Sequence, residues 1–262
     1  MRIALGIEYD GTAYNGWQRQ KTGTGVQECV EKALGEIADH PVEVVCSGRT
    51  DTGVHASGQV IHFDTDADRE PRNWILGANS RLPDDVNVRW AKRVSDEFHA
   101  RYCATARTYR YLILNSSIRS SLFRHRVWCV HEPLAEQHMQ AGADYLTGKH
   151  DFSAFRASGC QASTATRNLT HLNISRQGDW LAITVTANAF LQHMVRNITG
   201  TLTEIGKGAR PTEWAREVLE SRDRTTAGIA APAQGLTLVN IEYPVAFDIP
   251  GCALPRLLPG IE

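Results

Sequence analysis

The chain has 262 residues, of which 42% are hydrophobic and 22% are charged, and its formal net charge at pH 7 is -1. This composition suits a folded protein of one large domain or two small ones, and it excludes general disorder. No apolar run approaches the roughly 18 residues of a membrane span, and Glu8 and Asp10 interrupt the N-terminus too early for a secretory signal. We therefore expect a cytoplasmic protein that does not enter a membrane, in which the scattered cysteines are small buried side chains: Cys29, Cys46, Cys103, Cys129, Cys160 and Cys252.

Residue patterns over positions 1–100 predict the order β-α-β-β-α-β. Alternation favours a strand over 1–10, and glycines indicate a loop over 11–25. An apolar stripe predicts a helix over 26–37, which Thr24 and Gln27 would open as a capping box. The same reasoning predicts the remaining elements of this part: strands at 41–46, 59–63 and 86–94, a loop at 47–58 and a helix over 71–79.

The second part of the chain repeats this rhythm loosely. Its predicted elements are a strand at 107–115, a helix over 133–146, a hairpin with strands at 170–176 and 179–187, helices over 190–205 and 211–220, and a closing strand at 236–243. Asn188 is the expected cap of the helix that begins at Phe190. Strands that follow one another without crossover helices imply a mostly antiparallel sheet with helices on one face. We therefore expect an α+β fold of two halves, 1–105 and 106–262.

Charge is distributed unevenly along the chain. Residues 1–100 carry 11 Lys and Arg against 16 Asp and Glu, whereas residues 101–262 carry 17 against 13. A local basic surface on a nearly neutral protein indicates a polyanionic partner, although genome composition explains the excess of arginine over lysine, 23 to 5, equally well. The window between Glu97 and Glu132 contains no acidic residue and six arginines: Arg101, Arg107, Arg110, Arg119, Arg124 and Arg126.

The densest group of reactive side chains lies in the loop 46–58, between two predicted strands. Its glycines allow tight turns, and Arg49, Asp51 and His55 project from it. A carboxylate on a rigid loop beside an arginine stays ionised and can act as a nucleophile or a base. The alternative is an aspartate that only caps a turn, but the crowding of reactive residue types favours a functional loop.

Two histidines and an acidic run suggest other sites nearby. His55 and His62 lack a clear third ligand for a metal, so we interpret both as structural or hydrogen-bonding residues. Asp64 and Asp66 resemble the DxD of aspartate-dependent phosphatases, but the alternating acids that follow are more typical of a solvated turn.

The strand 107–115 carries aromatic and basic side chains together. Arg107, Tyr109 and Tyr111 share one face, and Arg110 points to the other. Such a face suits base stacking and phosphate contact. An equally good interpretation is that both tyrosines are structural residues, half-buried in the sheet.

One arginine, Arg196, lies in an otherwise apolar helical stretch. A buried charge needs a partner, and Asp51 is a sensible one. The alternative is that Arg196 extends to the surface along its aliphatic stem.

The sequence SGRTDTGVHASGQ at 47–59 resembles the signature of the tRNA pseudouridine synthase A family, which modifies nucleotides 38 to 40 of the anticodon stem-loop. Thr52 stands where alanine is commoner, next to the key aspartate. Further matching motifs follow in order along the whole chain: EYDGTAYNGWQ at 8–18, FHAR at 98–101, ARTYRY at 106–111, HDFSAF at 150–155, FLQHMVRN at 190–197 and APAQGL at 231–236.

This resemblance implies a role for four residues. The catalytic aspartate of the family falls on Asp51, its active-site tyrosine on Tyr109 and its pairing arginine on Arg196. A loop arginine thought to help expel the target base falls on Arg49. The family fold has two similar α+β halves that share an extended antiparallel sheet, with the catalytic cleft between them. The resemblance also implies a homodimer that binds one tRNA with both subunits and uses no cofactor or metal.

Two other functions remain open from the sequence. A non-catalytic RNA-binding module of the same fold would keep the arginines and tyrosines but would not need Asp51. A metal-dependent phosphatase would be built on Asp64 and Asp66, and magnesium or a chelator would distinguish it.

Overall fold

The computed structural model describes residues 1–20 and 22–251. The chain divides into two compact units: Met1–Arg107 with the segment that begins at Thr237 form the first, and Thr108–Leu236 form the second. The closing strand thus belongs with the N-terminal part of the chain. Lys21 and residues 252–262, Cys252 among them, lie outside the described residues.

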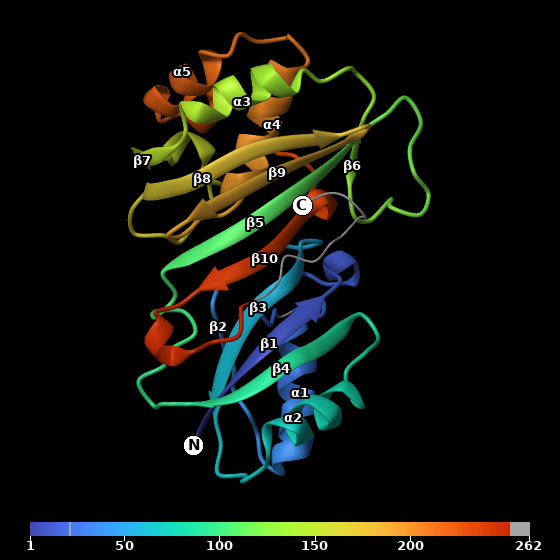
Figure 1. Ribbon diagram of the computed structural model, residues 1–262, viewed down its shortest axis with the longest axis vertical. Helices are drawn as coiled ribbons and strands as arrows, with labels where there is room; N and C mark the ends of the chain where they lie inside the picture. Colours follow the sequence, from blue (N-terminus) through green and yellow to red (C-terminus); the bar gives the residue numbers. More distant parts are fainter. Residues whose placement is uncertain (21, 252–262) are drawn as a thin grey trace. The chain divides into compact units, whose positions relative to one another are not determined.

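The first unit is a sheet in the order β4-β1-β3-β10, with β2 paired to β3 (Figure 1). Strand β1 is antiparallel to both neighbours, whereas β10 runs parallel to β3, with Thr237 opposite His55. Helices α1 and α2 pack together beside this sheet. The elements are β1 (Arg2–Tyr9), α1 (Val26–Ala38), β2 (Val45–Cys46), β3 (His55–Asp64), α2 (Pro71–Asn79), β4 (Val86–Val94) and β10 (Leu236–Glu242).

The core of the first unit lies between the sheet and its helices. Leu34 of α1, Trp74 of α2 and Phe63 of β3 are each at most 1% exposed. The rings of Phe63 and Trp74 meet edge to face with centroids 5.1 Å apart. Burial of such large aromatic side chains contributes much of the stability of a domain, so this cluster provides a firm base for the strands that carry the candidate site.

Three local predictions for this unit are wrong. Helix α1 begins at Val26 after Gly25, without a side-chain cap, and Gln27 bonds Glu31 instead of closing a capping box. Strand β2 is only two residues long. Strand β3 begins at His55, four residues before the predicted start, because this segment pairs with both β1 and β10. His55 is therefore a strand residue and not a loop residue.

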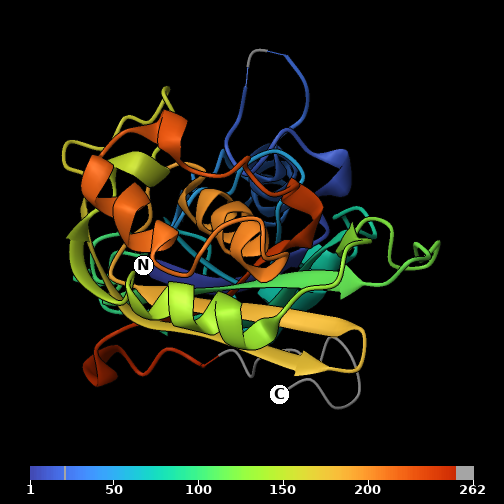
Figure 2. The same cartoon turned by 90° about the horizontal axis from the view of Figure 1, so that it is seen from above.

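The second unit is a sheet in the order β5-β9-β8-β7, with β6 paired in parallel to β5. Gly178, at a φ of 59°, makes the tight turn of the β8–β9 hairpin. The helices of this unit lie on one face of the hairpin (Figures 1 and 2). The elements are β5 (Ala106–Asn115), β6 (Trp128–Val130), α3 (Glu136–Asp144), β7 (Gly148–Asp151), β8 (Thr166–Gln177), β9 (Trp180–Ala187), α4 (Met194–Gly206) and α5 (Trp214–Ser221).

Each helix of the second unit begins three or four residues later than predicted. The largest consequence is at α4, which begins at Met194 because His193 adopts a φ of 60° that an α-helix does not accommodate. Asn188 is not its cap, since its side-chain oxygen accepts a hydrogen bond from the Asn168 amide at 2.9 Å. Arg196 therefore stands in the first turn of α4 and not in the middle of a helix.

The α+β class is confirmed, with helices beside a sheet in each unit. The sheets are mixed, because β10 pairs in parallel with β3, and β6 with β5. The five cysteines within the described residues are free thiols, and they are half-buried where burial was predicted. Across residues 1–20 and 22–251, no helix has the length and hydropathy of a membrane span.

Candidate active site

The loop Ser47–Val54, which we call the Asp51 loop, joins β2 to β3 and is held by hydrogen bonds from neighbouring strands. The Ser47 hydroxyl donates to Gln59 Oε1 at 2.6 Å, and Gln59 Nε2 donates to the Gly48 carbonyl at 2.7 Å. The hydroxyls of Tyr9 and Thr50 lie 2.7 Å apart in the buried interior. Both ends of the segment that precedes Asp51 are therefore anchored to rigid strands.

Two glycines allow the backbone around Asp51 to pack closely. Gly53, at a φ of 75°, occupies the third position of a turn closed by a 3.1 Å bond from the Val54 amide to the Asp51 carbonyl. Gly16, at a φ of 92°, packs so tightly that a Cβ there would lie 2.6 Å from the Thr50 carbonyl oxygen. The backbone before Asp51 is therefore closely packed at Thr50, and the backbone after it is closed into a turn.

Asp51 and Arg49 differ in exposure although they are two residues apart. Asp51 is half-buried, and Arg49 is exposed. A half-buried carboxylate on a fixed backbone is well placed to attack a bound substrate, because little motion has to be restricted on binding. An exposed arginine on the same loop is able to enter a nucleic acid stack.

Arg107 supports the Asp51 loop from behind. Its guanidinium donates to the carbonyls of Ser47 at 3.1 Å, Arg101 at 2.7 Å and Ala104 at 3.0 Å. An arginine that spans three main-chain carbonyls fixes the path of the backbone. We predicted that Arg107 shares an RNA-facing surface with the tyrosines of β5. The structure instead shows its guanidinium bound to main-chain carbonyls, so we assign Arg107 a positioning role.

Tyr109 of the second unit is nearly enclosed. It is 8% exposed, and its ring meets Phe190 edge to face with centroids 5.1 Å apart. Tyr111, on the same strand, is fully buried, and its hydroxyl donates to the Pro232 carbonyl at 2.7 Å. Tyr111 is thus a structural tyrosine, and Tyr109 is the member of the pair that lies closer to the surface.

Arg196 is fixed by a reciprocal pair of bonds. Its Nε donates to the Ala231 carbonyl at 2.7 Å, and the Ala231 amide donates to the Arg196 carbonyl at 3.0 Å. Behind it, Gly200 permits close packing, since a Cβ there would lie 1.8 Å from the Ile229 carbonyl oxygen. Arg196 is half-buried, so its guanidinium is held in one orientation at the start of α4.

The six arginines of the acid-free window differ in their exposure and their roles. Arg107 has the positioning role above, and Arg110 is buried at 3% exposure, where desolvation lowers its pKa. A buried arginine cannot attract RNA from solution. The basic surface therefore reduces to four exposed residues: Arg101, Arg119, Arg124 and Arg126.

The interpretation of both histidines as structural is confirmed. His55 and His62 are 2% and 4% exposed, and their Nδ1 atoms accept from the amides of Gly11 at 3.0 Å and Ala100 at 3.1 Å. The acidic run is solvated as predicted, because Asp64, Asp66, Asp68 and Glu70 are all exposed, but Asp64 is the last residue of β3 and not part of a turn. Among the described residues, no three His, Cys, Asp or Glu side chains converge as metal ligands.

His62 should make folding sensitive to acid. Burial, aided by the charge of Arg2, lowers its pKa from 6.5 to about 4 in the folded chain. Between these values the unfolded chain binds a proton that the folded chain excludes, so stability should fall as pH decreases from 6.5 to about 4, by about 3 kcal/mol at most. Above pH 6.5 the effect is absent.

Urea unfolding near pH 7 and near pH 4.5 measures this effect. His62→Asn retains an acceptor for the Ala100 amide but does not titrate, so it should lose less stability on acidification than the wild type. Equal losses in the two proteins would show that His62 is not responsible.

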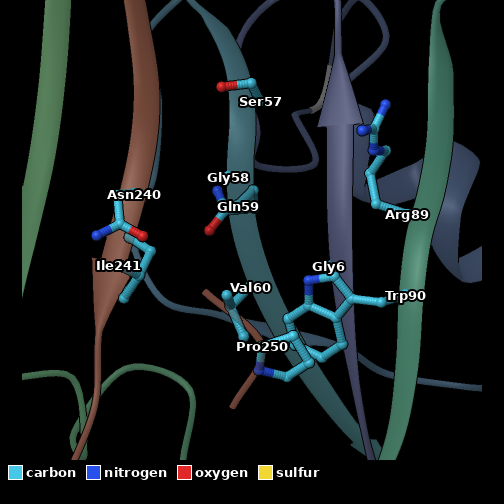
Figure 3. Close-up of a pocket in the computed structure, with 10 residues that line it drawn as sticks. All are labelled: Gly6, Ser57, Gly58, Gln59, Val60, Arg89, Trp90, Asn240, Ile241 and Pro250. Atoms are coloured by element: carbon cyan, nitrogen blue, oxygen red, sulfur yellow. The ribbon is translucent and has the colours of Figure 1, made fainter. Parts of the chain in front are cut away.

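One small cavity lies in the first unit (Figure 3), and no residue of the Asp51 loop lines it. It has a volume of about 20 Å³ and lies beside Gly6, Trp90 and Pro250. A Cβ on Gly6 would lie 2.1 Å from the Trp90 ring, so glycine is required for this ring to cross the strand. Because the space holds about one water molecule, the cavity is too small for a nucleoside.

Sequence reasoning missed the residues that position the site. Tyr9, Gln59 and Arg107 hold the Asp51 loop, and Ala231 fixes Arg196. Gln59 and Ala231 lie within quoted motifs, which is a signal that could have found them. Tyr9 and Arg107 also lie within quoted motifs, at 8–18 and 106–111, but nothing local marks either residue as a support of the Asp51 loop.

Comparison with known proteins gives a consistent result. Residues 6–103 and 143–244 match the family described as tRNA pseudouridine synthase. The chain is 52% identical over 260 residues to tRNA pseudouridine synthase A of Vibrio parahaemolyticus, with 99% of this chain and 98% of that protein covered. It is 54% identical over 260 residues to the protein of that name from Pseudoalteromonas atlantica, with 99% and 97% covered. For the Colwellia psychrerythraea protein the identity is 52% over 257 residues, with 98% and 99% covered.

Proposed function

The chain belongs to the tRNA pseudouridine synthase family and is an isomerase that acts on uridine in tRNA, and from this premise we propose that it converts uridines 38, 39 and 40 of the anticodon stem-loop with Asp51 as the catalytic residue. The observation that carries the proposal is the rigid support of Asp51 by the backbone of Gly16 and the turn at Gly53. Neither a non-catalytic binding module nor a phosphatase accounts for relatives that carry the synthase name over their whole length.

The chemistry explains the types of residue involved. Uracil has to leave C1′ through N1, rotate and rejoin through C5. An ionised carboxylate achieves this by attack on C1′, by removal of the 2′ proton to give a glycal, or by attack on C6 of the base. We assign this role to Asp51, which Arg196 would keep ionised. No cofactor or metal is required in any of these routes.

The target base lies in a stem and has to be flipped out, at a cost of a few kcal/mol. We assign Arg49 to the space that the base leaves, because it is exposed and belongs to the same loop as the nucleophile. We further propose that the protein acts in the cytoplasm as a homodimer whose two subunits contact one tRNA.

Incubation with an unmodified tRNA transcript, followed by mapping of pseudouridine, tests the function. Product at nucleotides 38 to 40 supports the proposal, and product only elsewhere would overturn the anticodon stem-loop assignment. Equal activity with magnesium and with a chelator is the expected result for a carboxylate mechanism.

Tyr109→Phe should slow isomerisation by about 100-fold or more while tRNA affinity stays within a few fold. The ring packs on Phe190 and would stack near the uracil without the hydroxyl, but the relay of the C5 proton would be lost. Single-turnover kinetics and a binding titration separate the two effects. Full activity in this variant would exclude the relay and leave only stacking.

Substitution of an exposed arginine of the acid-free window by alanine should weaken binding to all tRNA substrates. Each lost phosphate contact should reduce the slope of log affinity against log salt by about 0.7–0.9. Arg110→Met is the matched control, because Arg110 lies in the same window but is buried, and it should leave the slope unchanged. An unchanged slope for Arg101, Arg119, Arg124 and Arg126 alike would show that RNA binds elsewhere.

A further inference from the structure

The turn that follows β4 presents an aromatic and cationic surface formed by His99, Arg101 and Tyr102, which we call the Tyr102 platform. Tyr102 is 76% exposed, and its ring stacks on His99 with centroids 4.3 Å apart and planes inclined by 28°. The guanidinium carbon of Arg101 lies 5.7 Å from the centre of the same ring. Tyrosine is enriched where a protein surface meets a partner, because its ring offers apolar contact and its hydroxyl stays solvated.

The platform is rigid before any ligand arrives. His99 Nδ1 accepts from the amides of Arg101 at 3.2 Å and Tyr102 at 3.1 Å, and the His99 carbonyl accepts from the Cys103 amide at 2.9 Å. The middle of the turn is fixed as well, because the Ala100 carbonyl accepts from the Tyr243 hydroxyl at 2.7 Å. A ring presented in one orientation loses little conformational freedom on binding.

The platform and the Asp51 loop share one support. Arg107 donates to the carbonyl of Arg101 in the platform and to the carbonyl of Ser47 in the loop. Both lie within the first unit. A single guanidinium therefore fixes the backbone of the platform relative to the backbone of the Asp51 loop.

The chemistry of the platform suits a nucleotide. An accessible aromatic ring offers a stacking surface for any base, and an arginine beside it can pair with a phosphate. No carboxylate occurs in the sequence from 98 to 131 to repel a polyanion. We propose that the Tyr102 platform binds an unpaired nucleotide of the tRNA, with the base stacked on Tyr102 and a phosphate held by Arg101. This inference rests on the proposed function, since RNA is the ligand.

Binding of an unmodified tRNA transcript to three variants tests the proposal. Tyr102→Ala should weaken affinity by roughly 5- to 150-fold without changing the salt slope, because stacking involves no phosphate. Tyr102→Phe should bind as the wild type does. Arg101→Ala should lower the salt slope by about 0.7–0.9. Leu76→Ala, at an apolar residue of α2 that is 56% exposed, is the control for loss of surface area and should bind normally.

Four results would overturn the proposal. If Tyr102→Ala binds the transcript with unchanged affinity and the wild-type enzyme isomerises it, the proposed role of the platform is wrong. The proposed function is then not affected. A change of oligomeric state in Tyr102→Ala, measured by sedimentation, identifies a protein interface instead. A lowered melting temperature that Tyr102→Phe restores, with no effect on affinity, identifies a structural residue. A wild-type enzyme that neither binds nor isomerises the transcript overturns the proposed function together with this inference.

Discussion

Asp51→Asn should abolish isomerisation, with a loss of about 10⁴-fold or more in the single-turnover rate. Loss of a covalent nucleophile has effects of this size in other enzymes, and an amide neither attacks C1′ nor removes the 2′ proton. Binding of tRNA should stay within a few fold of wild type, because phosphate contacts dominate affinity and a carboxylate makes none. The fold should be retained, because asparagine is close in size to aspartate and the turn is closed by a main-chain bond from the Val54 amide to the carbonyl of residue 51.

Asp66→Asn is the matched control for this substitution. Asp66 is exposed in the acidic run after β3 and was the basis of the phosphatase alternative. It should retain full activity. Measurable turnover in Asp51→Asn at saturating tRNA would show that another group performs the attack.

Arg196→Ala should reduce the rate and also destabilise the second unit. Loss of the charged bond from Arg196 Nε to the Ala231 carbonyl should cost about 1.5–3 kcal/mol of unfolding free energy. If Arg196 pairs with the nucleophile, the single-turnover rate should fall as well, because the variant lacks the cation that would orient the carboxylate. Denaturant titration and single-turnover kinetics measure the two effects separately.

Arg196→Lys distinguishes charge from geometry. Lysine retains the positive charge, so the single-turnover rate should fall less than it does in Arg196→Ala. It cannot reproduce the planar donor that reaches Ala231, so the loss of stability should persist. A normal melting temperature and a normal rate in Arg196→Ala would show that neither role is correct.

The sequence predicted the elements with strong local signals. Helix α2 has its predicted bounds, Pro71–Asn79, because proline favours the first turn of a helix. The start of α4 was misplaced because Phe190 and Leu191 continue the apolar pattern of the helix. They are apolar for another reason: Phe190 packs on Tyr109, and Leu191 is 4% exposed ahead of a backbone reversal at His193. Periodicity alone cannot distinguish these causes.

Sequence reasoning identified candidate reactive residues but not their supports. Asp51 stood out because arginine, threonine, glycine and histidine crowd the same loop. The residues that hold the loop are distant in sequence: Tyr9 is 41 positions from Thr50, and Arg107 is 60 from Ser47. Such pairings depend on the folded arrangement of the strands, so no local pattern reveals them. Arg110 illustrates the converse, because its charge indicated a surface role that its burial removes.

The return of β10 to the first unit has a consequence during protein synthesis. The ribosome makes the Asp51 loop and β3 early, but the parallel partner of His55 and Ala56, the pair Thr237 and Leu238 on β10, is made only after the whole second unit. A nascent chain therefore holds the start of β3 without its neighbour on one side, while the whole second unit is already available to fold. The first unit should therefore reach its final fold only after the second unit has been synthesised, so the Asp51 loop gains its full support late.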